Sequence, residues 1–169
     1  IRGQRPLRDA HPTDPGVLVR DVAASCRSLC DRAGVALEVS VADDVPPVKA
    51  DEAALRRAVQ NLLANALKHA ADGRWIGVVV GSGATRGRRE VSIAVSDRGP
   101  GIATADIGHV FEPFYRGRQA IERQVRGNGL GLSVVRQVAE AHGGSVVVKS
   151  APGQGATFTL RLPAAVAQV

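Results

Sequence analysis

The sequence predicts an α/β fold in which helices cover one face of a mixed sheet. Three long segments repeat apolar residues at helical spacing, and five shorter runs have the alternating or β-branched character of strands. The order helix, strand, helix, strand, strand, helix, strand, strand is typical of helices layered on a sheet. At 169 residues the chain has the size of one domain and can bury a continuous core without disulfide or metal staples.

The first predicted elements are a helix and a strand that follow an irregular start. Residues 1–12 are rich in Arg, Pro and Gly without periodicity, so we interpret them as a linker. Thr13 or Asp14 can cap a helix whose first turn tolerates Pro15. A strand over 35–41 follows this helix. The apolar stripe of the helix is broken and consists of Val17, Leu18, Val22, Leu29 and Cys30.

The strongest helix signal begins near Asp51, after a turn over 43–47. Strand-like runs at 75–80 and 91–96 come next, joined by a Gly- and Arg-rich stretch over 81–89 with the composition of a solvated hairpin loop. We expect these two strands to pair antiparallel. In the helix that begins near Asp51, the apolar positions at helical spacing are Leu55, Ala58, Val59, Leu62, Leu63, Ala66 and Leu67.

The remaining sequence predicts a short helix over 104–110, a polar segment over 115–128 and a third long helix to about His142. Strands at 145–149 and 156–162 complete the fold. The expected division is therefore a linker (1–12), one domain (13–163) and a C-terminal tail (164–169).

Composition excludes several classes of protein. The net charge of +6 is compatible with nucleic acid or a membrane surface, but Arg-rich codon usage explains it equally, and no zinc-finger spacing or aromatic-rich basic strand is present. No apolar run reaches the roughly 20 residues that span a bilayer. Cys26 and Cys30 fit two small buried side chains better than a metal pair. We expect a cytoplasmic segment without nucleic-acid or direct membrane contact, whose parent chain carries any anchor elsewhere.

Polar side chains gather on one stripe of the second helix. They lie three or four residues apart, away from the Leu-rich face, which fits either a ligand site or a solvated surface. The four residues are Asn61, Asn65, Lys68 and His69.

Three glycine-containing segments follow along the chain. In the first, over 96–102, Asp97 ends a strand and Gly99 and Gly101 permit unusual torsions and close ligand approach. The second, over 127–132, opens a helix whose free N–H groups suit polyphosphate. The third, over 153–158, has the character of a hairpin turn. Each segment alone is also compatible with a plain surface turn.

Taken together, these four segments resemble the N, G1, G2 and G3 boxes of the histidine-kinase branch of the gyrase, heat-shock chaperone, histidine kinase and MutL ATPases. The run from Phe111 to Gly117 resembles the F box, which is more particular to histidine kinases. The resemblance covers roughly 13–163. It implies the Bergerat ATP-binding fold, a two-layer α/β sandwich with ATP held between the helical layer and a lid.

The resemblance also implies a role for each matched residue. Asn65 would bind Mg²⁺ with Asn61 beside it, and Lys68 would add charge near the phosphates. Asp97 would accept a hydrogen bond from the adenine amino group, and Thr157 would support that carboxylate. The implied catalytic residues are Asn61, Lys68 and Arg116. The implied nucleotide contacts further include His69, Gly99, Gly101, Ile102, Tyr115, Arg116, Gly127, Asn128, Gly129, Leu130, Gly131 and Leu132.

The lid implied by the resemblance lies between the F box and the third helix. Gly127, Gly129 and Gly131 would act as hinges and phosphate cradle, and Asn128 replaces the more usual Thr or Ser. Arg116 is the expected phosphate contact, whereas we interpret the other arginines there as solvated; the segment carries Arg116, Arg118, Arg123 and Arg126 against Glu122. Phe111 and Phe114 fit an anchor for the lid, a docking surface for the separate helical domain, or the core equally well.

The resemblance implies transfer of the γ-phosphoryl group of Mg-ATP to a histidine on a separate dimerisation domain, with a response regulator downstream. None of the four histidines lies in a phosphoacceptor pattern; they are His11, His69, His109 and His142. An isolated domain of this kind is expected to be monomeric. Two alternatives are an ATP-hydrolysing switch, disfavoured because Asn61 stands where such relatives place a Glu base, and a catalytically silent docking module.

Overall fold

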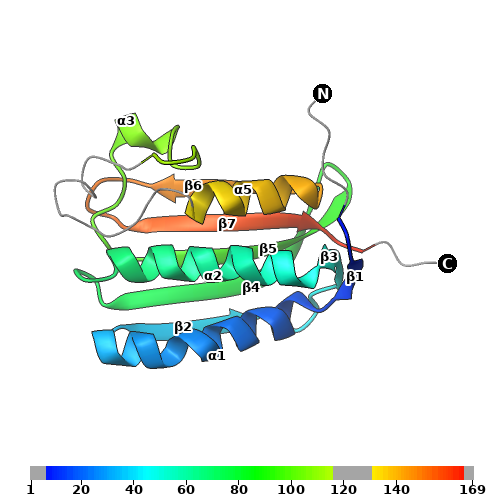
Figure 1. The fold of residues 1–169 in the computed structure, drawn as a ribbon, viewed down its shortest axis with the longest axis horizontal. Helices are drawn as coiled ribbons and strands as arrows, with labels where there is room; N and C mark the ends of the chain where they lie inside the picture. The colour runs from blue at the N-terminus through cyan, green and yellow to red at the C-terminus, as the bar shows by residue number, and fades with distance from the viewer. Residues whose placement is uncertain (1–6, 116–130, 166–169) are drawn as a thin grey trace.

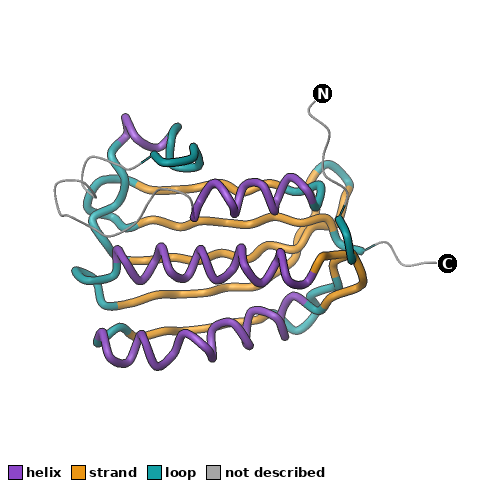
Figure 2. Tube along the Cα trace, in the orientation of Figure 1, coloured by secondary structure: helices purple, strands orange, loops and turns teal. Residues whose placement is uncertain are grey.

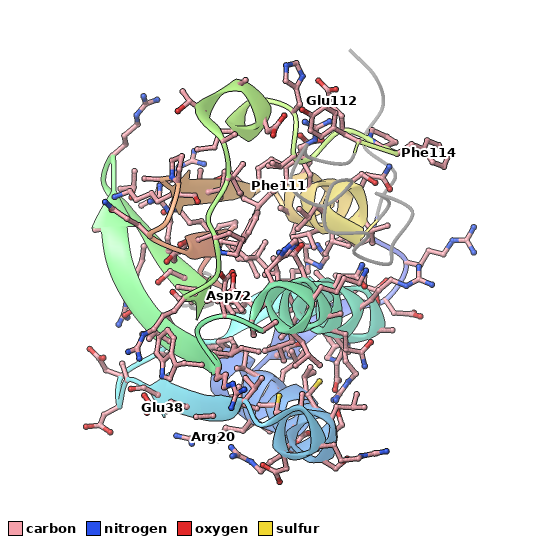
Figure 3. All side chains as sticks on the ribbon, turned by 90° about the vertical axis from the view of Figure 1, so that its left-hand side faces the viewer. Arg20, Glu38, Asp72, Phe111, Glu112 and Phe114 are labelled. Atoms are coloured by element: carbon pink, nitrogen blue, oxygen red, sulfur yellow. The ribbon has the colours of Figure 1, made fainter. Side chains whose placement is uncertain are left out.

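The chain forms a two-layer α/β sandwich in a computed structural model that describes residues 7–115 and 131–165. A five-stranded sheet has the order β2-β4-β5-β7-β6, and α1, α2 and α5 cover one of its faces (Figure 1). The end-on view in Figure 3 shows the helices on one side of the sheet. The predicted mixed sheet with one helical layer is therefore confirmed, since β2 pairs parallel with β4 and the other pairs are antiparallel.

The first helix, α1 (Pro15–Ala33), is capped by Asp14, one of the two caps that the sequence predicts. The Asp14 carboxylate accepts hydrogen bonds from the Gly16 and Val17 N–H groups at 2.9 and 3.2 Å. The helix ends at Gly34, whose φ of 70° gives the left-handed cap that favours glycine.

A small second sheet corrects the predicted linker. β1 (Ala10–Thr13) pairs antiparallel with β3 (Val48–Asp51), so residues 10–12 belong to a strand and not to a linker. The predicted tail also joins this region, because the Ala165 N–H donates to the Pro47 carbonyl at 2.8 Å. Strands of four residues are too short to show a period-two pattern, and their register is set by partners distant in sequence.

The second helix, α2 (Glu52–His69), is capped by Asp51, whose carboxylate accepts from the Ala54 N–H at 3.2 Å. β2 (Ala36–Val41) lies beside β4 (Trp75–Thr85), which forms a hairpin with β5 (Arg88–Asp97). The predicted loop over 81–89 is wrong: the strands continue to a two-residue turn in which φ is 51° at Arg86 and 76° at Gly87. Two positive φ angles give the twist that matches a hairpin, without the usual Asn-Gly signature.

The remaining elements follow the predicted order. They are α3 (Thr104–Ile107), shorter than expected, α5 (Gly131–Ala141), β6 (Ser145–Ser150) and β7 (Ala156–Pro163). The tube in Figure 2 shows the three long helices running side by side over the strands. Within the described ranges, no helix is both long and apolar enough to cross a bilayer.

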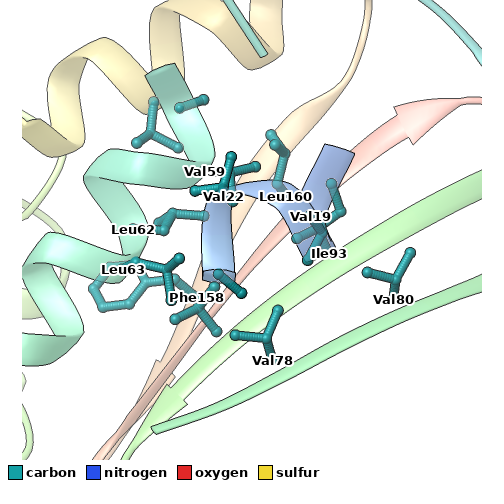
Figure 4. Packing of buried hydrophobic residues seen from close by; sticks show 14 of the residues in the cluster. Val19, Val22, Val59, Leu62, Leu63, Val78, Val80, Ile93, Phe158 and Leu160 are labelled. Atoms are coloured by element: carbon teal, nitrogen blue, oxygen red, sulfur yellow. The ribbon is translucent and has the colours of Figure 1, made fainter. Parts of the chain in front are cut away.

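The core between the two layers is mostly aliphatic. Leu62 of α2, Ile93 of β5 and Leu160 of β7 are each at most 1% exposed, and Phe158 adds an aromatic ring to the cluster (Figure 4). Alternate residues of β5 face this core, which places Val91, Ile93, Val95 and Asp97 on the helix-covered side of the sheet. The Asp97 carboxylate thus lies on the same buried face of β5 as the three apolar side chains before it.

A buried histidine joins the ends of two helices. The His142 Nδ1–H donates to the Val138 carbonyl at 2.7 Å, and Nε2 accepts from the Asp51 N–H at 3.1 Å.

His142→Ala is expected to lower the free energy of unfolding by about 1–3 kcal/mol, because the Asp51 N–H loses its acceptor. Urea unfolding measures the change. His11→Ala, at a side chain 53% exposed, is the control, and equal losses in both variants would contradict the assignment.

Candidate functional site

The polar residues singled out from the sequence gather at one end of the sandwich. The end of α2, the loop after β5 and the β6–β7 connection meet there, while β1 and β3 lie at the opposite end (Figure 1). Figure 3 views this end directly, with Asp72 just beyond the last turn of α2. The candidate site is therefore built from segments far apart in sequence.

Asp97 is the buried acid of this site. Its side chain is only 6% exposed, and one carboxylate oxygen accepts a hydrogen bond from the Gly99 N–H at 2.9 Å. Burial raises the pKa of the Asp97 carboxyl above its ordinary value, while the Gly99 N–H, the nearby His69 and the Ala156 N–H pull that pKa partly back. The loop therefore holds a hydrogen-bond acceptor in a position largely screened from water.

Glycines let three segments approach one another around Asp97. A Cβ on Gly99 would lie 2.2 Å from the His69 carbonyl oxygen at the end of α2. Gly155 has a φ of 71°, and a Cβ there would lie 2.1 Å from the Asp97 carbonyl oxygen. Since neither position has room for a side chain, Gly99 lets the loop pass against the end of α2 and Gly155 lets the β6–β7 connection pass against the loop. The predicted close approach of Gly99 to a ligand stays a prediction.

The loop after Asp97 is hydrogen-bonded to the β6–β7 connection. The Gly155 N–H donates to the Gly99 carbonyl at 3.1 Å, and the Gly153 N–H donates to the Pro100 carbonyl at 2.7 Å. The Ser150 hydroxyl accepts from the Ile102 N–H at 2.8 Å and donates to the Gly155 carbonyl at 2.6 Å. Two of the predicted glycine segments thus form one unit.

Ser150 is a site residue that the sequence interpretation missed. It bridges both loops, yet a single serine at a strand end carries no pattern of its own; its place three residues before Gly153 was the available signal. Gly101, with a φ of 76° and its Cβ position 2.1 Å from the Ala151 carbonyl oxygen, passes close to the same connection.

Thr157 does not take the predicted place beside Asp97. In the antiparallel register Thr157 faces Ser96, and their hydroxyl oxygens are 2.8 Å apart. Asp97 faces Ala156 instead. Because side chains alternate between the faces of a strand, Thr157 lies on the side away from the helices, and the prediction that it supports the carboxylate is wrong.

The polar stripe of α2 lies along the helix that ends at this site. Asn61 and Asn65 are half-buried, and the Asn61 amide donates to the carbonyl of Gly131, the first residue of α5, at 3.2 Å. His69 is half-buried and close enough to Asp97 to affect the pKa of its carboxyl, whereas Lys68 is exposed. The structure therefore brings His69, at the end of the stripe, next to Asp97, and brings Asn61, in the middle of α2, next to the start of α5.

The two phenylalanines of the 111–117 run have different surroundings. The Phe111 ring packs edge-on against Phe158 of the core with 5.9 Å between centroids. Phe114 is 71% exposed, has a φ of 64° and points away from the domain in Figure 3. Phe111 therefore belongs to the core, whereas Phe114 does not. A docking role for Phe114 stays a prediction.

Tyr115, expected to contact nucleotide, is engaged within its own segment. Its hydroxyl donates to the Asp106 carboxylate, which raises the pKa of the Tyr115 phenol, and its ring stacks on His109 at 5.3 Å. Five further predicted contacts lie outside the described residues: Arg116, Gly127, Asn128, Gly129 and Leu130. Gly131 and Leu132 open α5, with Leu132 packed against the core.

Comparison with known protein families agrees with this geometry. Residues 50–166 match the family model described as histidine kinase-, DNA gyrase B-, and HSP90-like ATPase. The chain belongs to this family. The match includes α2, the Asp97 loop and the β6–β7 connection, so every described segment of the site falls inside it.

Relatives of this ATPase domain include sensor kinases. The chain is 36% identical over 169 residues to the sensor-like histidine kinase SenX3 of Mycobacterium tuberculosis, covering 97% of the chain and 39% of that protein. It is 38% identical over 129 residues to the alginate biosynthesis sensor protein KinB of Pseudomonas aeruginosa, covering 76% of the chain and 20% of KinB. The chain therefore spans about two fifths or less of these relatives.

Solved structures show the same fold. Full-length ShkA in complex with AMPPNP superimposes with a TM-score of 0.79 at 31% identity, over 99% of the chain and 33% of ShkA. The mycobacterial sensor histidine kinase MprB gives 0.75 at 30% identity, over 92% of the chain and 98% of the MprB chain. The histidine-kinase ATPase domain, with its Bergerat α/β fold, is therefore the architecture of this chain.

The donor set of this ATPase-family site suits a nucleotide with a hydrated cation. Asp97 offers a screened carboxylate acceptor, and Gly99 leaves no side chain over it. Asn61 and Asn65 offer amide oxygens, which are ligands that Mg²⁺ accepts alongside water and phosphate oxygens. Lys68 and His69 add positive charge or donors at the end of α2. The residues present therefore offer an acceptor for a base, amide oxygens for a cation and positive charge for phosphates.

Proposed function

We propose that this chain is the catalytic domain of a sensor histidine kinase, which binds Mg-ATP and donates the γ-phosphoryl group to a histidine on a separate phosphoacceptor domain. The observation that carries the proposal is the buried Asp97 carboxylate, fixed by the Gly99 N–H at the end of β5. The likeness to SenX3 and MprB supports the kinase branch of the family.

Asp97 gives the site its preference for adenine. A carboxylate only accepts hydrogen bonds, so it pairs with the exocyclic amino group of adenine and rejects the carbonyl that guanine carries at the same position. Gly99 and Gly101 keep the loop free of side chains where the base lies. Ile102, packed against the core, adds an apolar contact to the base.

The polar stripe of α2 holds the phosphates and the cation. Asn65, with Asn61 beside it, provides amide oxygens for Mg²⁺, and Lys68 and Arg116 neutralise phosphate charge. Bound Mg-ATP supplies the transferable group: the bond from the γ-phosphorus to the β–γ bridging oxygen breaks, ADP leaves, and a phosphorus–nitrogen bond forms with the acceptor imidazole. The residues of this chain position the nucleotide and neutralise the charge of its phosphates, and they form no covalent bond with it.

The acceptor imidazole belongs to another domain. His142 is buried with both ring nitrogens engaged, and His109 is bound to Glu112 at 2.9 Å. His69 stands at the nucleotide site itself. A response regulator would take the phosphoryl group from the separate histidine, and the isolated chain is expected to be monomeric, which light scattering tests.

The proposal is tested by calorimetric titration with AMPPNP, with and without Mg²⁺, against GMPPNP. We expect adenine-selective binding that Mg²⁺ strengthens, and transfer of radiolabel from ATP to an added phosphoacceptor domain but not to this chain. Vigorous ATP hydrolysis by the chain alone would favour the alternative of an ATP-driven switch. Absence of nucleotide binding would favour a silent docking module.

Asn65→Ala tests the cation assignment. Loss of the amide oxygen is expected to remove most of the Mg²⁺-dependent gain in AMPPNP affinity, while affinity without Mg²⁺ stays unchanged, because the amide contacts the cation and not the base. Gln60→Ala is the matched control, since it removes an exposed amide from the same helix outside the stripe. An undiminished Mg²⁺ effect in Asn65→Ala would contradict the role of this residue.

A further inference from the structure

Arg98 and Trp75 form a stacked pair on the face of the sheet that the helices leave open. The last register pair of the β4–β5 hairpin at this end is Ile76 with Asp97. Trp75 and Arg98 lie one residue further, so they face the side opposite Asp97. The Arg98 guanidinium carbon is 4.1 Å from the centroid of the Trp75 ring, a distance typical of a cation–π contact.

The surroundings fix this pair in place. A Cβ on Gly77 would lie 2.4 Å from the Trp75 ring, so the ring lies along its own strand over a residue without a side chain. The Trp75 Nε1–H is buried and has no hydrogen-bond partner among the described residues. A Cβ on Gly73 would lie 2.3 Å from the Arg98 carbonyl oxygen. Tight packing, not hydrogen bonding, therefore sets the position of the ring.

We propose that the Trp75–Arg98 pair positions the Asp97 carboxylate for adenine, which rests on the proposed nucleotide-binding function. The two residues that follow Asp97 are both held in place: Arg98 is stacked on Trp75, and Gly99 is packed under the His69 carbonyl. These contacts restrict the backbone torsions on the C-terminal side of Asp97 and so aim its side chain toward the helical layer. Arg98 is a positioning residue, since its side chain lies on the face opposite the base.

The pair also provides its own spectroscopic signal. Trp75 is the one tryptophan of the 169-residue sequence. Its ring contacts the residue next to Asp97, so nucleotide binding at Asp97 is expected to change the environment of the ring and hence the fluorescence of Trp75. A purely structural stack away from the site would give no such change.

The test compares Arg98→Gln and Arg98→Lys in the full 169-residue chain by titration with AMPPNP and with ADP. Arg98→Gln is expected to weaken both nucleotides equally, roughly two- to fivefold, and to abolish the Trp75 fluorescence change. Arg98→Lys keeps a cation over the ring and is expected to restore most of the affinity. Arg88→Gln, with the same charge change at the far end of β5, is expected to bind as the unmodified chain does.

The outcomes separate this inference from the function on which it rests. If the unmodified chain binds AMPPNP but Arg98→Gln binds equally well, positioning by the pair is overturned and the proposed function stands. If Arg98→Gln weakens AMPPNP far more than ADP, Arg98 acts on the phosphates and the inference is also overturned. If the unmodified chain binds no nucleotide, the proposed function fails and the inference fails with it. Arg98 is exposed, so these variants leave the core intact.

Discussion

Asp97→Asn is expected to weaken AMPPNP binding about 10- to 100-fold, the loss that follows when a hydrogen bond to a charged acceptor is removed. The amide that replaces the carboxylate can still accept from the Gly99 N–H, so the loop keeps its shape. Calorimetric titration measures the change, with Asp72→Asn, at an exposed position beyond the end of α2, as the control. Equal affinity in Asp97→Asn and the unmodified chain would remove Asp97 from the base site.

The same substitution is expected to make the nucleotide-free domain more stable at neutral pH. The pKa of the Asp97 carboxyl is raised in the folded protein, mainly by burial, so the folded state binds a proton more readily than the unfolded state. The stability linked to that proton is complete below the unfolded pKa and is lost as pH rises through the raised folded pKa. Thermal unfolding from pH 4 upward, roughly the ordinary Asp pKa, should show this loss for the unmodified chain, and Asp97→Asn should lack it.

Gly99→Ala is the second change with a large expected effect. The added methyl would lie 2.2 Å from the His69 carbonyl oxygen and 2.9 Å from a carboxylate oxygen of Asp97. Backbone atoms must move to admit it, so the free energy of unfolding is expected to fall by about 1–3 kcal/mol. AMPPNP affinity is expected to fall by more than tenfold, because Asp97 is displaced along with the end of α2.

Gly83→Ala is the matched control for that experiment. Gly83 lies in β4, and a Cβ there meets no atom within 4 Å. The same chemical change should therefore leave both urea unfolding and AMPPNP titration as they are in the unmodified chain. If Gly99→Ala behaved like Gly83→Ala, the close approach of α2 to the Asp97 loop would not control nucleotide binding.

The sequence predicts those parts of the fold whose signals are local. The apolar rows of α2 and β5 follow directly from spacing, and Asp14 and Asp51 cap helices where a short acid before a periodic run indicates it. The strand at 10–13 and the extended hairpin escaped prediction for the opposite reason. Both depend on pairing with a partner strand, and pairing compensates for residues such as Pro12 and Gly83 that disfavour strands on their own.

The sequence predicts which residues belong to the candidate site but not how their side chains are arranged. Asp97, Gly99 and the α2 stripe follow from their motifs, whereas the role of Thr157 depended on which face of β7 it occupies. Register decides that face, and a shift of one residue reverses it. The bridging hydroxyl of Ser150 and the Trp75–Arg98 stack were equally hidden, because each joins segments whose proximity only the folded chain creates.

The hydrogen bonds between the Asp97 loop and the β6–β7 connection have a consequence for the thermodynamics of binding. Backbone groups of Gly99, Pro100 and Ile102 are engaged in these hydrogen bonds. Under the proposed function, the loop that would meet adenine is held by these hydrogen bonds, so little conformational entropy would be lost there on binding of the base. Small adenine-like molecules that lack phosphates should therefore still bind this site more tightly than the corresponding guanine analogues.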